Sequence, residues 1–406
     1  MTAVESLILL NTIEGLGIVR LRGLLKIYNS LQAILNNPSK DKLKHVEGIG
    51  DIIAGAIIDL AVRDNGQYKE ERLNRELDLI KKNNIQIVTI FDENYPSTLK
   101  QIYDPPMLLY IKGSIIPEDI LAVAVVGSRR ASYYGLAAAE KLSTDLAAKG
   151  ITVVSGLARG IDSAAHRGAL KAKGRTMAVL GSGLGVVYPP ENKKLFEAIA
   201  DNSGAIVSEF PYETIPDRKN FPMRNRVISG LSLGVVVVEA AQRSGSLITA
   251  NVALEQGRDV FSVPGKIDSF NSNGTNNLIK QGAKLVQTAD DIIEELEPVL
   301  GQYLQDLEKP GLSQDIKNKQ AGSNIPEKEA KVFLDDSAEG KSVSLKPAGL
   351  TQDEQKTYKA ISTEPLYIDD IIKQTAFPTS RVSGILMKLE LKKLVKQLPG
   401  KMFVLS

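Results

Sequence analysis

Six short apolar runs between residues 121 and 265 alternate with stretches that carry apolar residues at helical spacing. The runs are Leu121–Gly127, Ile151–Gly156, Thr176–Gly181, Ala205–Phe210, Gly234–Ala240 and Asp259–Gly265. Continuous apolar runs of this length are typical of strands buried on both faces, and strands that alternate with helices form parallel sheets with right-handed crossovers. The pattern therefore predicts an α/β fold with a doubly wound, Rossmann-like parallel sheet, to which Met107–Gly113 would add an edge strand.

An internal repeat precedes these runs. Ile13–Leu25 and Val46–Ile58 each contain an acidic residue, a Gly-x-Gly step and then apolar residues at helical spacing. Glycines allow a tight turn between two helices, and backbone N–H groups in such a turn can face a phosphate. The repeat predicts a small all-α N-terminal domain, residues 1–84, with two helix-hairpin-helix-like units. Contact with DNA and simple packing are equally compatible with this pattern.

The pattern changes again toward the C-terminus. Residues 308–349 are rich in Lys, Asp, Glu, Ser, Gly and Pro, which predicts a flexible linker after a sheet domain that spans 85–307. The pattern of residues 350–406 predicts three helices and a terminal hairpin, the arrangement of a winged-helix-like domain. Its third helix carries the charged residues Arg381, Lys388, Glu390, Lys392 and Lys393. Because this excess of positive charge is small for a helix that binds DNA, a protein-interaction or auxiliary role is favoured.

Composition narrows the classes of function. The 406 residues include no cysteine, and 50 basic residues against 48 acidic ones give a formal charge of +2. The lack of cysteine excludes disulfides, cysteine–zinc sites and thiol catalysis. The small bulk charge means that any nucleic-acid binding must come from a local patch. The N-terminus lacks signal-peptide features and no apolar run reaches the ~20 residues of a membrane span, so we expect a cytoplasmic protein without membrane contact.

Small, hydroxyl-bearing and basic residues follow several of the predicted strands. In a doubly wound sheet, ligands bind beyond the carboxyl ends of the strands. Small residues let a ligand approach the backbone, hydroxyl groups and helix N-termini bind anionic oxygens, and arginine suits the geometry of phosphate. We therefore predict a phosphate-binding edge. Its residues from the segments after the strands are Gly127, Ser128, Arg129, Gly156, Arg159, Arg243, Ser244, Gly245 and Ser246.

One predicted helix raises a problem of charge. The segment "NFPMRNRVISGLS", residues 220–232, predicts a helix that begins at Pro222. It places two arginines, Arg224 and Arg226, in a first turn where the helix dipole is already positive. On a helical wheel Arg224 falls inside an apolar arc whose members are Met223, Val227, Ile228 and Leu231.

Two kinds of partner would resolve this conflict. An anion bound over the first turn would offset the dipole and give Arg224 a counter-charge. Alternatively, an arginine here is structural and pairs with a carboxylate at a strand end, such as Glu209 or Glu239. We expect the second explanation to hold for at least one of Arg224 and Arg226.

The sequence nominates no catalytic residue, metal or cofactor. There is no G-x-G-x-x-G after the first strand and no G-x-x-x-x-G-K-[ST] anywhere, which disfavours a nicotinamide cofactor and a P-loop ATPase. His166 lies four residues after Asp162, so a packed or capping role is favoured over a Ser–His–Asp triad. With two histidines and no cysteine, a transition-metal site is disfavoured.

An ordered series of motifs runs from about residue 99 to residue 293. The motifs are "VVGSRRASYYG", "VVSGLARGIDSAAHRGAL", "TMAVLGSGLGVVYPPENKKL", "SEFPYETIPDRKNFPMRNRVISGLSLGVVVVEAAQRSGSLITANVALEQGRDVFSVPG" and "SNGTNNLIKQGAKLV". They resemble the DNA-processing protein A family (DprA, also called Smf). The resemblance implies a non-enzymatic protein that binds single-stranded DNA during natural transformation, protects it from nucleases and helps load the recombinase RecA. It also implies a homodimer through the sheet domain, near residues 276–300.

The resemblance also assigns residues to DNA binding. They are the arginine of the Gly-Ser-Arg motif, Arg129, and the basic and aromatic residues Arg218, Lys219, Phe221 and Arg224. A single strand needs phosphate contacts and an aromatic surface for its bases, and such a surface binds without sequence preference. Phe221 is the favoured stacking residue. For the nearby Tyr133, Tyr134 and Tyr188 we expect packing roles.

A rival interpretation is an enzyme. The sheet resembles, more distantly, nucleoside-monophosphate phosphoribohydrolases, which carry a P-G-G-x-G-T-x-x-E motif. The comparable segment here is "RSGSLITANVALEQ", which lacks Pro-Gly-Gly and reaches an acidic residue only at Glu255. Release of free base from nucleoside monophosphates would favour the enzyme. Failure to bind single strands at low salt would favour a third class, a protein-binding adaptor.

Overall fold

A computed structural model of the chain describes residues 1–202 and 204–307, and beyond them only parts of the C-terminal segment. Those parts are residues 356–358, 360–361, 366–375, 377, 382, 385–386, 395–398 and 402–405. The chain forms two compact units, residues 1–337 and 338–406. The predicted linker, 308–349, lies outside the described residues, and the predicted domain boundaries stay predictions.

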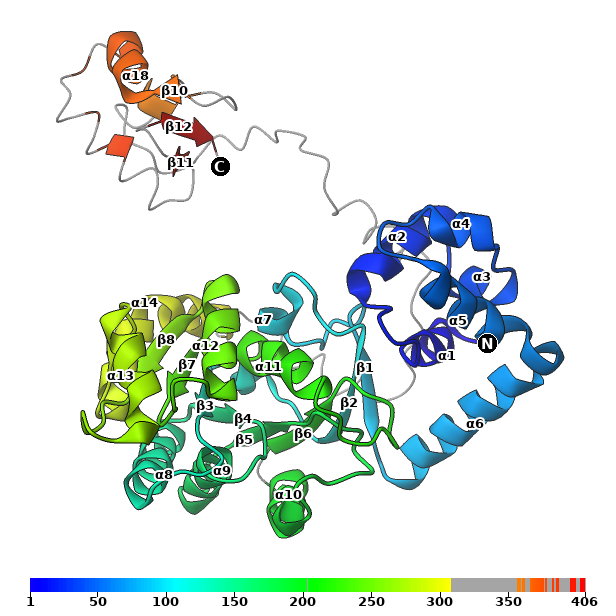
Figure 1. Ribbon diagram of the computed structural model, residues 1–406, viewed down its shortest axis with the longest axis horizontal. Coiled ribbons are helices and arrows are strands. Elements are labelled where there is room, and N and C mark those ends of the chain that lie inside the picture. Colours follow the sequence, from blue (N-terminus) through cyan, green and yellow to red (C-terminus); the bar gives the residue numbers. More distant parts are fainter. Residues whose placement is uncertain are drawn as a thin grey trace. The chain divides into compact units, whose positions relative to one another are not determined.

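Helices dominate the first 82 residues, as the repeat predicted (Figure 1). They are α1 (Ala3–Leu10), α2 (Ile18–Tyr28), α3 (Leu31–Asn36), α4 (Lys40–Lys44), α5 (Asp51–Val62), the 3₁₀ turn η1 (Arg63–Gly66) and α6 (Gln67–Lys82). The two Gly-x-Gly steps lie just before α2 and α5, where Gly17 and Gly50 are the N-cap residues. Arg20 holds the two turns together, since its guanidinium donates to the carbonyl oxygens of Gly15 (2.6 Å) and Gly48 (2.9 Å).

A nine-stranded sheet forms the centre of the first unit. Its strands are β1 (Gln86–Thr89), β2 (Leu108–Gly113), β3 (Ala122–Val126), β4 (Thr152–Ser155), β5 (Thr176–Val179), β6 (Gly204–Ser208), β7 (Gly234–Val237), β8 (Asp259–Ser262) and β9 (Lys284–Leu285). Their order is β1-β2-β6-β5-β4-β3-β7-β8-β9. All neighbours from β6 to β9 pair in parallel, so the six predicted strands and the doubly wound fold are confirmed.

The prediction of an edge strand at Met107–Gly113 is wrong in its position. This segment contains β2, which pairs antiparallel with both β1 and β6 and therefore lies inside the sheet. The edges are β1 and β9, four and two residues long. Neither carries a continuous buried run, because β1 begins with exposed Gln86 and both residues of β9 are exposed. The sequence pattern therefore gave no signal for either edge.

Helices cover both faces of the sheet. They and the short turns between strands are α7 (Ser97–Lys100), η2 (Pro117–Ile120), α8 (Tyr133–Ala148), α9 (Ile161–Lys171), η3 (Pro190–Asn192), α10 (Lys193–Asn202), α11 (Asn220–Gly230), α12 (Gly245–Glu255), η4 (Phe270–Ser272), α13 (Asn273–Lys280) and α14 (Ala289–Leu307). In Figure 1, α8, α9 and α10 lie along one face and α11 and α12 along the other. Along β3, Val123 and Val125 join the apolar cluster of α8 and α9, while Ala124 and Val126 join that of α11 and α12.

The described parts of the second unit contain a small sheet and a helix. These are β10 (Leu366–Tyr367), α18 (Ile368–Thr375), β11 (Val395–Leu398) and β12 (Met402–Leu405). Strands β11 and β12 form the predicted terminal hairpin, and β10, which the sequence did not predict, pairs with β12. Arg381 and the other named charges of the third predicted helix lie outside the described residues. Within the described parts of the chain, no helix has the length and apolar character needed to cross a membrane.

Candidate nucleic-acid interface

An exposed arginine and a phenylalanine meet beyond the carboxyl ends of the central strands. Arg129, in the loop between β3 and α8, places its guanidinium carbon 4.9 Å from the ring centre of Phe221, at the start of α11. Gly181, after β5, makes room for that ring, because a Cβ there would lie 2.9 Å from it. Tyr188 adds a second ring, 5.9 Å from Phe221 between centres. This cluster combines accessible positive charge with aromatic surface, as single strands require.

A second arginine, Arg224, lies near the same ring, with its guanidinium carbon 6.0 Å from the centre of Phe221. Arg224 is only 4% exposed, so its predicted position on the buried arc of α11 is confirmed. Its Nη1 donates to the carbonyl oxygens of Gly156 (2.7 Å) and Val179 (2.6 Å), at the ends of β4 and β5. Gly156 is required here, because a Cβ would lie 2.0 Å from Nη1. Backbone carbonyls thus supply part of the compensation that the sequence left open.

A buried carboxylate lies among these groups. Asp162, at the start of α9, is 6% exposed and accepts hydrogen bonds from the N–H groups of Gly156 (3.1 Å) and Ala158 (3.3 Å). Burial raises the pKa of Asp162, whereas nearby Arg224 opposes that shift. Burial, with a smaller contribution from Arg129 and against the opposing effect of Asp162, lowers the pKa of Arg224 to about 10. Two cations therefore face one carboxylate, which leaves excess positive charge at the edge.

His166 has the packing role that the sequence predicted. It is fully buried, and its Nδ1 lies 2.7 Å from the hydroxyl of Thr176, which itself donates to the carbonyl oxygen of Val153. Because the single hydroxyl proton of Thr176 is used in that bond, Nδ1 of His166 must be protonated and donate to the Thr176 oxygen. Burial, followed by the charges of Arg224 and Arg167, lowers the pKa of His166 to about 3. The ring is therefore neutral near pH 7.

Arg226, two residues after Arg224, has carboxylate partners. Its Nη2 lies 2.5 Å from Glu209 and its Nε lies 3.2 Å from Asp104. The prediction that at least one of the two arginines pairs with a strand-end carboxylate is confirmed. Glu239 has a different role, because it accepts from the N–H (2.8 Å) and the hydroxyl (2.5 Å) of Ser132, at the start of α8.

Two details of the predicted helix are wrong. The helix α11 begins at Asn220, two residues before Pro222. Proline is tolerated there because first-turn N–H groups have no partner within the helix. Met223 is 45% exposed and does not belong to the buried arc. It lies at the edge of that arc and in the first turn, where solvent can reach it.

The remaining predicted residues flank the cluster in different ways. Arg159 forms an ion pair with Glu191, and Lys219 lies 2.7 Å from Glu14 in the first N-terminal turn. Ser128 donates its N–H to the carbonyl oxygen of Glu239 (2.7 Å), which joins the segments that follow β3 and β7. The other predicted members of the edge are Gly127, Arg218, Arg243, Ser244, Gly245 and Ser246.

Of these, Arg218 and Arg243 are exposed, and Ser244 caps α12 by accepting from the N–H of Ser246. The group after β7 follows a strand that is the neighbour of β3 in the sheet. The structure thus brings together Arg129, Gly156, Phe221 and Arg224.

Sequence reasoning missed the supporting residues. In the sequence analysis Gly181 is only the end of a predicted strand, Tyr188 is expected to pack, and Asp162 is noted for its spacing from His166. A glycine directly after a buried strand was the available signal for Gly181. Among the described residues, no group of three or more His, Cys, Asp or Glu side chains could hold a metal ion.

Comparison with known proteins gives consistent matches. The family model for DNA recombination-mediator protein A matches residues 86–297, and the model for the DprA winged helix domain matches residues 344–401. Protein Smf of Synechocystis sp. is 37% identical over 402 residues, 96% of this chain and 95% of that protein. DNA processing protein DprA of Streptococcus pneumoniae is 47% identical over 209 residues, 52% of this chain and 73% of that protein.

Solved structures agree with these matches. The X-ray structure of DNA processing protein A from Streptococcus pneumoniae matches 73% of this chain and 99% of that one, with 36% identity and a TM-score of 0.62. The winged-helix prediction is confirmed by the second family model. The chain belongs to the DNA processing protein A (DprA/Smf) family.

Proposed function

We propose that this protein binds single-stranded DNA at the edge formed by Arg129, Phe221 and Arg224. One observation carries the proposal: the exposed guanidinium of Arg129 lies 4.9 Å from the centre of the Phe221 ring, and the buried guanidinium of Arg224 lies 6.0 Å from the same centre. Phosphates would bind the arginines, and a base would stack on Phe221. Every nucleotide offers a phosphate and an aromatic face, so binding needs no particular sequence.

The flanking residues extend this edge. Lys219 and Arg159 are exposed, and their carboxylate partners Glu14 and Glu191 lie at the surface, where solvent screens the ion pairs. A phosphate can therefore replace these carboxylates at low cost. Gly127, Ser128, Arg218 and the group from Arg243 to Ser246 would add backbone, hydroxyl and cationic contacts.

The cellular role that we propose follows from the family. As a recombination mediator, the protein would shield incoming single strands from nucleases during natural transformation and help load the recombinase RecA onto them, in the cytoplasm and without a catalytic step. The family description as a DNA recombination-mediator protein supports this role. Incubation with nucleoside monophosphates tests the rival class, because release of free base would indicate an enzyme.

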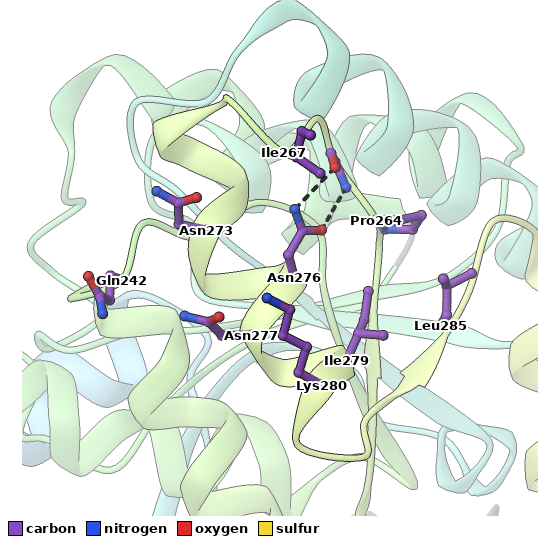
Figure 2. A pocket seen from close by; sticks show the side chains of 10 residues that line it. Gln242, Pro264, Ile267, Asn273, Asn276, Asn277, Ile279, Lys280 and Leu285 are labelled. Atoms are coloured by element: carbon purple, nitrogen blue, oxygen red, sulfur yellow. Dashed lines mark hydrogen bonds between the residues drawn. The ribbon is translucent and has the colours of Figure 1, made fainter.

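We also propose a homodimer through the β9 edge of the sheet. A cavity of about 510 Å³ lies between the loop after β8, α13 and β9 (Figure 2). Its lining includes Ile267 and Leu285, which are 93% and 44% exposed, and β9 has an unpaired edge. Exposed apolar side chains beside an open strand edge favour association with a second copy. Sedimentation of a Leu285→Glu variant tests this, and an unchanged mass would contradict it.

The test of single-strand binding compares fluorescently labelled single-stranded and duplex oligonucleotides of mixed sequence. We expect tighter binding of single strands, and a slope of log K against log salt of about −2 to −3 if three or four phosphates are neutralised. Arg129→Ala should weaken binding while the melting temperature stays unchanged, because Arg129 is exposed. A variant truncated after Leu307 should still bind. Loss of binding on truncation, or a slope near zero, would contradict the proposed site.

A further inference from the structure

The loop that carries Arg129 leads to an aromatic residue that is almost fully exposed. Tyr133, the first residue of α8, is 89% exposed, so the packing role that we expected for it is wrong. Its neighbour Tyr134 is 52% exposed and donates its hydroxyl to the carbonyl oxygen of Pro264 (2.9 Å). Tyr134 thus anchors the loop, whereas Tyr133 presents its ring to solvent.

A second segment lies against this loop and carries another exposed ring. Besides the Tyr134 bond, Asn271 donates its side-chain amide to the carbonyl oxygen of Arg130 (3.1 Å). The two bonds join the loop after β3 and the start of α8 to residues 264–271, although their partners are 130 and 141 positions apart in sequence. Phe270, adjacent to Asn271, is 73% exposed. Two solvent-exposed rings therefore occur in two segments that are held together.

The charge around these rings is mainly positive. Arg129, Arg130 and Lys266 are exposed in the two segments, and Asp268 is the acidic residue among them. Exposed aromatic rings interleaved with cations are the combination that binds single strands, because rings stack on bases while cations hold phosphates. The surface is also continuous with the candidate interface, since Arg129 belongs to both.

We propose that the bound single strand continues from Phe221 across this second surface, with bases on Tyr133 and Phe270 and phosphates at Arg130 and Lys266. This inference rests on the proposed function and extends it, because it assigns the path of the strand beyond the first nucleotides. A strand long enough to reach both aromatic groups gains contacts that a short strand cannot make. Affinity should therefore rise with strand length until the strand reaches both aromatic groups.

The first experiment compares two oligothymidylates, of about 5 and about 16 nucleotides, on the full chain. The double variant Tyr133→Ala/Phe270→Ala should bind the longer strand about tenfold or more weakly and the shorter strand as the unmodified chain does. Tyr103→Ala is the matched control, because Tyr103 is 82% exposed but lies in the segment between α7 and β2. It should leave both affinities unchanged.

The second experiment detects stacking directly. The chain contains no tryptophan, so Tyr133→Trp creates a single fluorescent reporter at the proposed stacking position. The longer strand should quench its emission at saturation, and the shorter strand should not. Tyr103→Trp supplies the control reporter, whose emission should not respond to either strand.

The outcomes separate the two proposals. If Arg129→Ala weakens binding of both lengths while Tyr133→Ala/Phe270→Ala changes neither and the reporter stays unquenched, the second surface is overturned and the proposed function stands. If the unmodified chain binds no single strand, both are overturned. If the double variant instead changes the sedimenting mass at unchanged DNA affinity, a second copy of the chain covers this surface and the inference is wrong.

Discussion

Two arginines of α11, Arg224 and Arg226, show one residue type in two roles. Arg226 is 15% exposed at its side chain and contacts two carboxylates, Glu209 and Asp104. Arg224 is more deeply buried, yet two of its hydrogen bonds go to neutral carbonyl groups. The carboxylate that interacts with it, Asp162, also interacts with Arg129. One side of the helix is therefore close to neutral, whereas the other retains positive charge.

This difference shows what makes an arginine available for an external anion. Burial does not decide it, because both arginines lie mostly inside the molecule. What decides it is whether carboxylates already balance the charge. Carbonyl dipoles orient the Arg224 guanidinium without cancelling its charge, so a phosphate at the edge still gains from it.

The largest effect is expected on stability, when Arg226 loses its pairing with carboxylates. Arg226→Met would leave the carboxylate of Glu209, whose pKa burial already raises, without its cation. Removing one partner of a buried ion pair costs about 3–5 kcal/mol, so urea unfolding should show a loss near that range. The affinity of the folded protein for single strands should change little.

A double variant tests the reason for that loss. In Arg226→Met/Glu209→Gln the one carboxylate left without its cation is Asp104, whose side chain is 49% exposed and stays solvated, so much of the stability should return. If the double variant is as unstable as Arg226→Met alone, packing of the arginine, and not the pairing of charge, explains the loss.

On the side of Arg224, the free energy of unfolding should depend on pH because of the buried His166. Its pKa is about 3 in the folded state, below its ordinary value of 6.5, so between these values the unfolded chain binds a proton that the folded chain does not. Stability must therefore fall as the pH falls through 6.5. From pH 6.5 to 4.5 this group should remove about 2 kcal/mol from the free energy of unfolding.

The contribution of His166 is isolated by a variant that lacks its imidazole. Asp162 contributes in the opposite direction, because its pKa is raised in the folded state. The measurement is therefore the difference between the unmodified chain and His166→Gln in urea unfolding at several pH values. Equal pH slopes in the two proteins would show that His166 keeps an ordinary pKa.

The expected changes in DNA affinity are smaller than these changes in stability. Arg224→Ala should weaken single-strand binding by more than about 1 kcal/mol, the scale of a charge-assisted hydrogen bond, and Arg129→Ala should do the same. The double variant should lose less than the sum, since both residues would hold one backbone segment. A folded Arg224→Ala protein with unchanged affinity would leave Arg224 only its role at the carbonyls.

The smallest effect concerns the link to the N-terminal helices. Glu14 and Lys219 form an exposed ion pair, so Glu14→Gln should raise single-strand affinity by less than about fivefold by freeing the lysine. Binding titrations at low salt should reveal the gain, and high salt should abolish it. A decrease in affinity would mean that Glu14 positions Lys219 for DNA.

The sequence predicted the features that depend on local pattern. The buried parallel strands follow from continuous apolar runs, and the pairing of Arg226 with Glu209 follows from the strand-end position of that carboxylate. It could not predict the partners of Arg224, because backbone carbonyls leave no trace in residue types. It also missed the pairing of Lys219 with Glu14, which lie 205 positions apart. Such contacts depend on how whole elements pack.

Gly156 shows how small a change could redistribute charge at this edge. The absence of a side chain at this glycine leaves a socket, the space that the Arg224 guanidinium fills. The Cβ of an alanine would lie 2.0 Å from Nη1 and clash with it. Gly156→Ala would not alter the number of charges, but it would force the guanidinium out of the socket and toward solvent. The depth of a cation, and so the strength of its field at the surface, is therefore encoded in a neighbouring residue that carries no charge.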